Sequence, residues 1–412
     1  MKRSHQSHAR SSSPQGQQGS RVLSSLHASV SPPRKRSTPA KQPHLAAIEA
    51  GQVQVTDHPA IISSRLTQCI RPFSPGSPRL DVAAWLGLYR RNLHPKGRHF
   101  VVHQHDHPIA GVHYDLRLQF SETSSVSWSI MYGLPGDPNS RRLNRNATET
   151  RVHCLWNHLI ETASARTGSM LIWDTGEYEI LPYDIDLVGP ETDDSGTDDS
   201  SAPASRPVDD RSESEKLFQA FHNRKIRLRL HGTRLPPNYT VTLRLDKFSE
   251  IKVQSPRTPR KRRRRIHSKS QSTRQASTPP PESSGLDSTA EGTQDLPDHS
   301  DDENDKIDAT IRAENAYPGS VNTIGSIHQR RWFLTLDRFS SGFQDEPGSG
   351  PAGKRWVRRL GADNQQIPGF EPFYVRGPEV ERSIVTGRLG REILEDEGVQ
   401  GFLPRRGWRP VL

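Results

Sequence analysis

The sequence predicts a mainly β protein with a few flanking helices and long disordered segments. Short stretches in which polar and apolar residues alternate are the main evidence, because successive side chains of a strand point to opposite faces. Only 31% of the 412 residues are apolar, and the chain contains 33 prolines. Much of its length therefore cannot bury enough surface to fold, and we expect one core of moderate size.

The helices and strands of this core follow from local patterns. A helix is predicted over 80–93, where apolar residues recur at helical spacing behind Asp81. A turn at Thr175–Gly176 is predicted to separate two strands. The other predicted helices cover 213–222 and part of 379–397, and the predicted strands are 100–105, 113–118, 126–132, 151–155, 169–174, 177–181, 226–230, 239–245 and 331–336, with a hairpin between 226–230 and 239–245.

Shifts in composition divide the chain into five regions. We expect the linker among them to be a long insertion between neighbouring strands of one sheet. A structureless loop of this length is unusual in a compact domain and is normally disordered. The C-terminal region is expected to pack on the core or to bind a partner. The predicted regions are a disordered basic, Ser- and Pro-rich arm (1–78), a β core (79–250) with an acidic loop (185–215), a disordered linker with basic and acidic tracts (251–322), a strand that returns to the core (323–345) and an extension of unknown role (346–412).

The overall charge favours a polyanionic partner. The net charge is +10, and nucleic acid is the simplest partner for such a surplus. No apolar run is long enough to span a bilayer, so no membrane partner is expected. The N-terminus lacks the apolar stretch of a secretory signal. Cys69 and Cys154 form neither a disulfide framework nor a zinc motif, which suits a reducing compartment.

A run of basic residues in the linker predicts nuclear localisation. It could instead be a solvated basic linker, but a second basic cluster at 34–36 favours nuclear import. The run consists of Arg260, Lys261, Arg262, Arg263, Arg264 and Arg265.

The most informative stretch places charged and apolar residues on opposite faces of one strand. His113, Asp115 and Arg117 share one face, and the three residues between and after them are apolar. Antiparallel pairing with the preceding strand would bring His105 close to them. A single histidine on a strand is usually an ordinary surface residue, but a wall of three polar groups is costly to bury unless they pair or bind an ion. Such a wall can hold a divalent metal and a phosphate.

These residues resemble the 3′-phosphoesterase domain of bacterial DNA ligase D. The resemblance covers about 95–250 and 326–338, and it implies a compact β-barrel whose active site is a cup on one side. With no ligase or polymerase motif in the chain, it would be a stand-alone member. The matching motifs are 100–106, 113–118, 127–129, Asp137-Pro138, Arg142-Leu143, His153, 172–176 and 230–232.

The resemblance implies a manganese-dependent activity that removes a 3′-phosphate or a terminal ribonucleoside from nucleic-acid 3′ ends, with DNA the expected substrate. Zn²⁺ or another divalent metal is the alternative to Mn²⁺. We expect a monomer that acts in DNA repair, with repair proteins as further partners. The implied metal ligands are His105, Asp115 and His153; the implied catalytic residues, in contact with the scissile phosphate, are His113 and Arg117; Arg142 is a weaker candidate for a phosphate contact.

Three positions depart from the family pattern. His103 stands where the family usually has glutamine, Asn157 where it has tyrosine, and Arg151 where it has an acidic residue. Losing the tyrosine hydroxyl removes a donor that could reach the phosphate. Two alternatives to an active enzyme therefore stay open: a catalytically weakened binding protein that uses the same barrel, and a plain nucleic-acid-binding β module that binds no metal.

Overall fold

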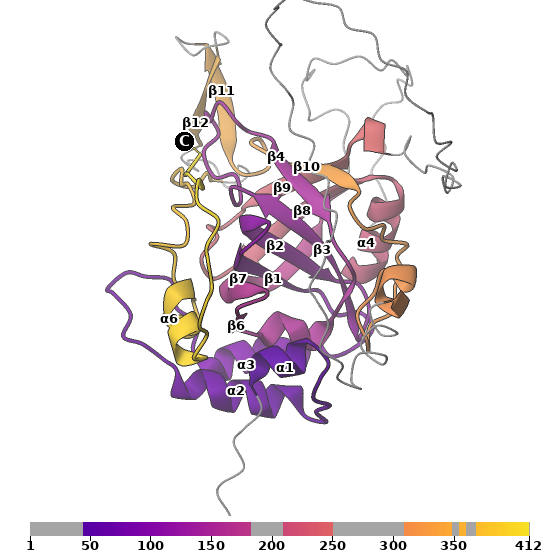
Figure 1. The fold of residues 1–412 in the computed structure, drawn as a ribbon. Coiled ribbons are helices and arrows are strands. Elements are labelled where there is room, and N and C mark those ends of the chain that lie inside the picture. Colours follow the sequence, from indigo (N-terminus) through magenta and orange to yellow (C-terminus); the bar gives the residue numbers. More distant parts are fainter. Residues whose placement is uncertain (1–43, 183–208, 250–308, 348–353, 360–367, 412) are drawn as a thin grey trace, which may run out of the picture. The chain divides into compact units, whose positions relative to one another are not determined.

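The computed structural model describes residues 44–182, 209–249, 309–347, 354–359 and 368–411 (Figure 1). Several sequence predictions lie outside these residues. They include the disorder of residues 1–43, most of the acidic loop and of the linker, and the basic run that begins at Arg260.

Eight antiparallel strands form a closed barrel, which confirms the predicted fold class (Figure 1). The strands follow the order β1-β2-β3-β4-β10-β9-β8-β7, and β7 pairs with β1 to close the barrel. Because β9 and β10 are neighbours, the long insertion between them is confirmed. The strands are β1 (His99–His107), β2 (Gly111–Gln119), β3 (Ser124–Met131), β4 (Arg145–Glu149), β7 (Gly168–Ile180), β8 (Lys225–Gly232), β9 (Thr240–Leu245) and β10 (Arg331–Leu336).

Shorter elements complete the fold. Two short strands, β5 (His153–Cys154) and β6 (Thr162–Ser164), pair with β3 and β7, and the 3₁₀ helix η1 (Leu155–Leu159) connects them. Outside the barrel, β11 (Phe343–Pro347) and β12 (Lys354–Arg358) form a hairpin. A second 3₁₀ turn, η3, spans Lys247–Ser249.

The predicted alternation decides which residues fill the barrel. Tyr114, Leu116 and Leu118 of β2 are fully buried in a cluster to which all eight barrel strands contribute. Helix α4 (Glu213–His222) adds Leu217 and Phe221 to this cluster. Each such side chain contributes roughly 1.5–3 kcal/mol through burial, so the cluster is the main source of the barrel's stability.

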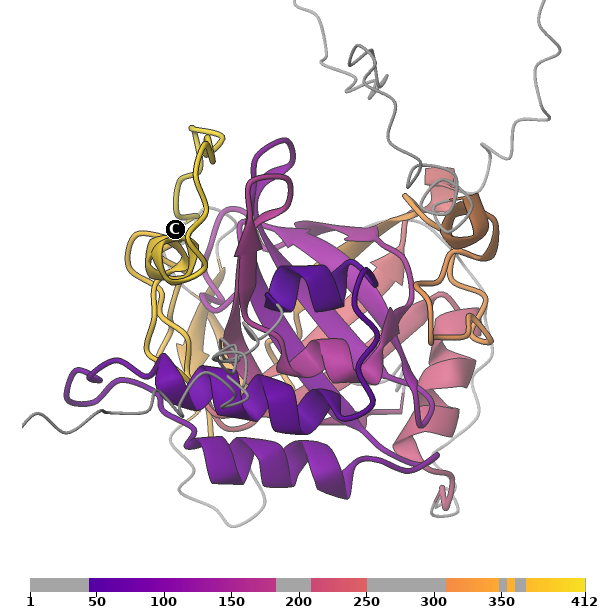
Figure 2. The ribbon, with the colours of Figure 1, turned by 60° about the horizontal axis from the view of Figure 1, so that its bottom comes forward.

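Three N-terminal helices cover part of the outer surface of the barrel, next to η1, β6 and the start of β7 (Figure 2). They are α1 (Leu45–Glu49), α2 (His58–Gln68) and α3 (Val82–Arg91). The predicted helix at 80–93 is confirmed as α3, and Asp81 caps it by accepting from the Ala83 and Ala84 amides. The prediction of disorder up to residue 78 was wrong for the described residues from 44, because α1 and α2 bury apolar side chains against Val101 and Ile172.

The C-terminal residues pack on the barrel. Helix α6 (Gly390–Asp396) contacts β6 and β7. Residues 379–389 are not helical, in contrast to the predicted pattern, because the backbone groups of Ile384 are paired outside the segment: its amide donates to the Ile172 carbonyl and its carbonyl accepts from the Leu80 amide. None of the helices in the described residues is long and apolar enough to cross a membrane.

The predicted turn at Thr175–Gly176 was wrong, since β7 runs through it without interruption. Thr175 is buried, and its hydroxyl donates to the carbonyl of Phe100 at 2.6 Å. Gly176 pairs with Gly232 of β8, and a β-carbon on Gly176 would overlap the carbonyl oxygen of His231. The glycine permits a close approach of two strands, which the sequence pattern cannot distinguish from a turn.

We expect Gly176→Ala to lower the free energy of unfolding by about 1–3 kcal/mol, because the added methyl group must push the two strands apart. Urea unfolding followed by circular dichroism measures this loss. Gly87→Ala is the matched control, since Gly87 lies in α3 with open space around it. A helical glycine-to-alanine change should stabilise by up to about 1 kcal/mol. Equal effects of the two changes would contradict the packing argument.

Candidate functional site

The pairing of β1 with β2 assembles the predicted site. His105 lies opposite His113, His103 opposite Asp115, and Val101 opposite Arg117. Val101 belongs to the cluster beneath the N-terminal helices, so these residues share the outer face of the barrel. The predicted approach of His105 to His113 and Asp115 is therefore confirmed.

Two imidazoles flank the carboxylate of Asp115. His105 Nδ1 lies 3.5 Å from Asp115 Oδ2, and His113 Nε2 lies 3.4 Å from Asp115 Oδ1. Within the described residues, this is the one group of three potential metal ligands whose donor atoms all lie within 4.8 Å of one another. Two imidazoles and a carboxylate suit a divalent transition metal.

Backbone carbonyls orient both imidazoles. His105 Nε2 donates to the Thr167 carbonyl at 2.8 Å, and His113 Nδ1 donates to the Gly111 carbonyl at 2.9 Å. In the neutral rings, the nitrogens that face Asp115 then carry lone pairs. Histidines that bind a metal through one ring nitrogen usually donate a hydrogen bond from the other, which fixes the orientation of the ring. The residues present therefore fit a metal.

Charges within the group shift the pKa values of its members in different directions. Burial would raise the pKa of Asp115, but His113, His105 and Arg117 hold it far below its usual range. Burial would lower the pKa of His105, yet contact with Asp115 outweighs burial and raises it. For His113 burial prevails and lowers the pKa, with only partial compensation by Asp115. His113 is therefore neutral at pH 7, and Asp115 is ionised.

We expect the affinity of this site for a divalent metal to fall as the pH is lowered through the raised pKa of His105. A proton on Nδ1 competes with the metal, so the loss should approach about tenfold per pH unit for one displaced proton. Titration calorimetry in two buffers of different ionisation enthalpy measures the released proton. The same profile is expected for His222→Gln, since His222 is an exposed residue of α4. Affinity that is independent of pH would exclude His105 as a ligand.

Arg117 supplies a cation beside the group. Its Nη2 lies 3.6 Å from Asp115 Oδ2, and its Nη1 donates to the Asn157 carbonyl at 3.3 Å. Only 3% of its side chain is exposed. In the part of the chain that the structure describes, its Nε has no hydrogen-bond partner, and neither do the two ring nitrogens of the buried His103 or Oδ1 of Asn157. Unpartnered buried polar atoms around a guanidinium leave room for a ligand to complete the hydrogen bonding.

His153 lies next to this group on β5, but it is not part of the set within 4.8 Å. Burial lowers its pKa well below the usual value, and the charges of Arg117, Asp115 and His105 also act on it. Asn157 Nδ2 lies 3.3 Å from His153 Nδ1, and this hydrogen bond orients the imidazole. Among the described residues the group of potential ligands around Asp115 therefore includes His113. The ligand role of His153 stays a prediction.

Arg142 lies in the loop between β3 and β4, where it is exposed. Its amide donates to the Ser140 hydroxyl, and its carbonyl accepts from the guanidinium of Arg145. These contacts connect Arg142 to its own loop. Its role as a phosphate contact stays a prediction.

Two residues near the site were missed because they lie in segments that were predicted to be disordered. Glu49 ends α1, and burial raises its pKa while Arg117 and His105 lower it. Tyr317 packs on His153 with ring centroids 4.7 Å apart. The prediction of disorder was thus wrong for the described residues from 309 to 322. Leu45 and Ile48, at helical spacing before Glu49, were the available signal; nothing local marked Tyr317.

The order of the motifs along β1, β2, β5 and β7 matches a known domain. Residues 103–243 match the family of the DNA ligase D 3′-phosphoesterase domain. The resemblance indicated by the motifs is therefore confirmed for this segment, which is roughly a third of the chain. It contains the candidate ligands, Arg117 and His153, whereas Glu49 and Tyr317 lie outside it. No curated protein matches the chain.

Proposed function

We propose that this protein is a metal-dependent phosphoesterase that removes a 3′-phosphate or a terminal ribonucleoside from nucleic-acid 3′ ends during DNA repair. The observation that carries the proposal is the group formed by His105, His113 and Asp115 beside Arg117, within a segment that matches the 3′-phosphoesterase domain. The net charge of +10 favours a nucleic-acid substrate, and we propose that DNA is preferred.

We propose Mn²⁺ as the metal, with Zn²⁺ as the alternative. Asp115, His105 Nδ1 and either His113 or His153 would hold it. A bound divalent cation would neutralise charge on the phosphate and acidify a bound water. The neutral state of His113 favours it as a ligand or proton acceptor over a proton donor. The fork of Arg117 would orient the phosphate oxygens.

The test uses the purified full chain, Mn²⁺ and a duplex whose primer ends in a 3′-phosphate or in one ribonucleotide. Loss of the terminal group, resolved by gel mobility and mass spectrometry, is the expected result, and it should require added metal. Metal binding without turnover would favour the weakened binding protein. No product, together with metal binding that survives His105→Ala with Asp115→Ala, would exclude a metal-dependent role for this site.

We further propose that the protein acts in the nucleus as a monomer. The basic run at Arg260–Arg265 and the cluster at 34–36 support nuclear import. A fluorescent fusion should accumulate in nuclei, and replacing the four basic residues 262–265 by alanine should redistribute it to the cytoplasm. Unchanged nuclear accumulation of that variant would exclude the run as the signal.

A further inference from the structure

The segment that follows the long insertion fixes Tyr317 against the site. Ala316 forms a parallel bridge with Val152, and the Tyr317 amide donates to the Val152 carbonyl at 3.0 Å. The Val152 amide in turn donates to the Asn315 carbonyl at 3.0 Å. These backbone bonds position the Tyr317 ring on that of His153, the residue next to Val152. The position of Tyr317 is therefore set by the backbone, not by a flexible side chain.

The phenol of Tyr317 lies in a basic environment. Burial raises its pKa and so does the carboxylate of Glu49, while the guanidiniums of Arg151 and Arg117 act to lower it. Burial has the larger effect, so the hydroxyl stays protonated at neutral pH and can donate a hydrogen bond. Tyr317 is only partly buried. A hydroxyl donor beside the guanidinium of Arg151 suits an anion.

Arg151 is a cation that has no carboxylate partner among the residues that the structure describes. Within the described residues it forms no ion pair, and its buried Nε has no hydrogen-bond partner. By contrast, Arg117 already contacts Asp115. A partly buried guanidinium is costly to leave unpaired, which favours an external anion as its partner.

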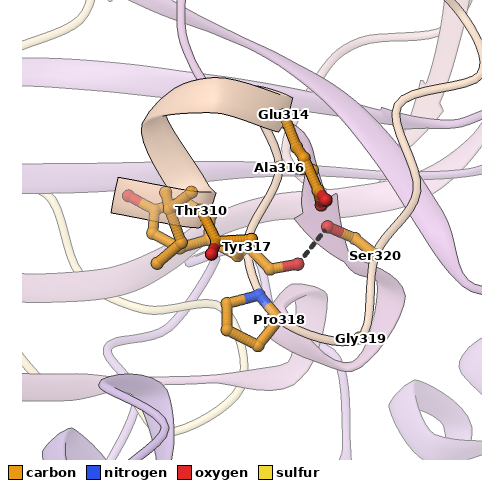
Figure 3. A pocket seen from close by; sticks show the side chains of 8 residues that line it. Thr310, Glu314, Ala316, Tyr317, Pro318, Gly319 and Ser320 are labelled. Atoms are coloured by element: carbon orange, nitrogen blue, oxygen red, sulfur yellow. Dashed lines mark hydrogen bonds between the residues drawn. The ribbon is translucent and has the colours of Figure 1, made fainter. Parts of the chain in front are cut away.

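The surface beside Tyr317 is hollowed. A cavity of about 340 Å³ opens there (Figure 3). Its lining consists of Thr310, Ile311, Glu314, Ala316, Tyr317, Pro318, Gly319 and Ser320. The Ser320 hydroxyl donates to the Tyr317 carbonyl at 2.7 Å, which closes the turn that forms one wall. A ligand chain therefore has space to continue past the tyrosine.

We propose that Arg151 and Tyr317 form a second phosphate-binding position beside His153, which holds a backbone phosphate of the strand whose 3′ end is processed at His105 and Asp115. This rests on the proposed function. Arg151 would donate to the non-bridging oxygens through its planar fork, and Tyr317 would donate through its hydroxyl. The position binds the strand and takes no part in the bond that breaks.

The first experiment compares two substrates that differ in their number of phosphates. One is an oligonucleotide with a 3′-phosphate, and the other is p-nitrophenyl phosphate, a monoester that has no second phosphate. For Arg151→Gln and Tyr317→Phe we expect KM for the oligonucleotide to rise about five- to tenfold, with kcat nearly unchanged and hydrolysis of the small ester unaffected. Arg90→Gln, in which an exposed arginine of α3 is replaced, is the matched control and should behave as wild type.

An equal loss on both substrates would mean that Tyr317 and Arg151 act only by supporting His153, and it would overturn the proposal. Tyr317→Phe keeps the ring contact with His153, so an effect of this change on KM alone reports the hydroxyl.

The second experiment measures binding without turnover. Fluorescence anisotropy with a labelled single-stranded oligonucleotide and EDTA should show weaker binding by Arg151→Gln, with the slope of log K against log salt reduced by about 0.7. If the wild type hydrolyses neither substrate, the proposed function fails, while the binding difference still tests the phosphate position. If both variants bind as the wild type does, the phosphate position is excluded even in an active enzyme.

Discussion

Replacing Asp115 by asparagine is expected to abolish metal-dependent hydrolysis and to weaken metal binding by at least about 100-fold. Asp115 is the carboxylate that both His105 and His113 contact, and its ionised form is maintained by three neighbouring cationic or ionisable groups. Asparagine has the same shape but no charge, so the fold should persist while the attraction for a divalent cation is lost. Calorimetric titration with Mn²⁺ and hydrolysis of a 3′-phosphate measure the two effects.

Glu122→Gln is the matched control for this change. It also converts a carboxylate to an amide, but Glu122 is exposed in the turn between β2 and β3. The metal affinity and the activity of the Glu122→Gln protein should stay within about twofold of wild type, as for other surface changes remote from a site. Wild-type Mn²⁺ affinity in Asp115→Asn would show that the metal binds elsewhere.

The second large effect is expected from Arg388→Ala, which should lower the free energy of unfolding by about 3–5 kcal/mol. Arg388 Nη2 lies 2.9 Å from Glu161 Oε2, and both side chains are almost completely buried. Removing the guanidinium leaves Glu161 with a buried charge, although the Thr386 hydroxyl still donates to it at 2.6 Å. Chemical denaturation followed by tryptophan fluorescence measures the loss.

Arg391→Ala is the control, because Arg391 of α6 pairs with Glu379 in a position where both side chains are largely exposed. Exposed ion pairs contribute about 0–1 kcal/mol, so this change should be nearly neutral. Replacing Glu161 by glutamine together with Arg388→Ala should recover part of the lost stability, since the buried charge is then absent. Equal stability of Arg388→Ala and wild type would mean that the buried pair with Glu161 contributes no net stability.

Local patterns predicted the strands of the site because their information lies in adjacent residues. In β2, polar and apolar side chains alternate, so the sequence alone assigns His113, Asp115 and Arg117 to one face. The short turn before β2 then brings β1 alongside, with His105 opposite His113. The cap at Asp81 likewise marked the start of α3. These predictions required no knowledge of distant contacts.

Other features depend on contacts between residues far apart in the sequence. In the sequence, Gly176 looks like a turn residue. The structure shows instead that the neighbouring strand β8 comes so close that a β-carbon at this position would overlap it. Glu49 follows only one short apolar turn of helix, and Tyr317 has no local pattern around it, so neither segment predicts a fold by itself. They are ordered because short apolar segments on either side pack on a barrel that already exists.

The sequence by itself determined the β class, the face on which the candidate ligands lie and the resemblance that the matched segment confirms. The tertiary structure alone decided that His113 joins His105 and Asp115 in one group of potential ligands, and that Arg151 gains Tyr317 as a neighbour. It also decided that the C-terminal residues belong to the barrel through Glu161 and Arg388. The physical reason is the distance along the sequence over which each effect acts. Alternation within a strand is set by the backbone geometry of that strand alone, whereas a buried charge is stable only where a residue distant in the sequence compensates for the lost water.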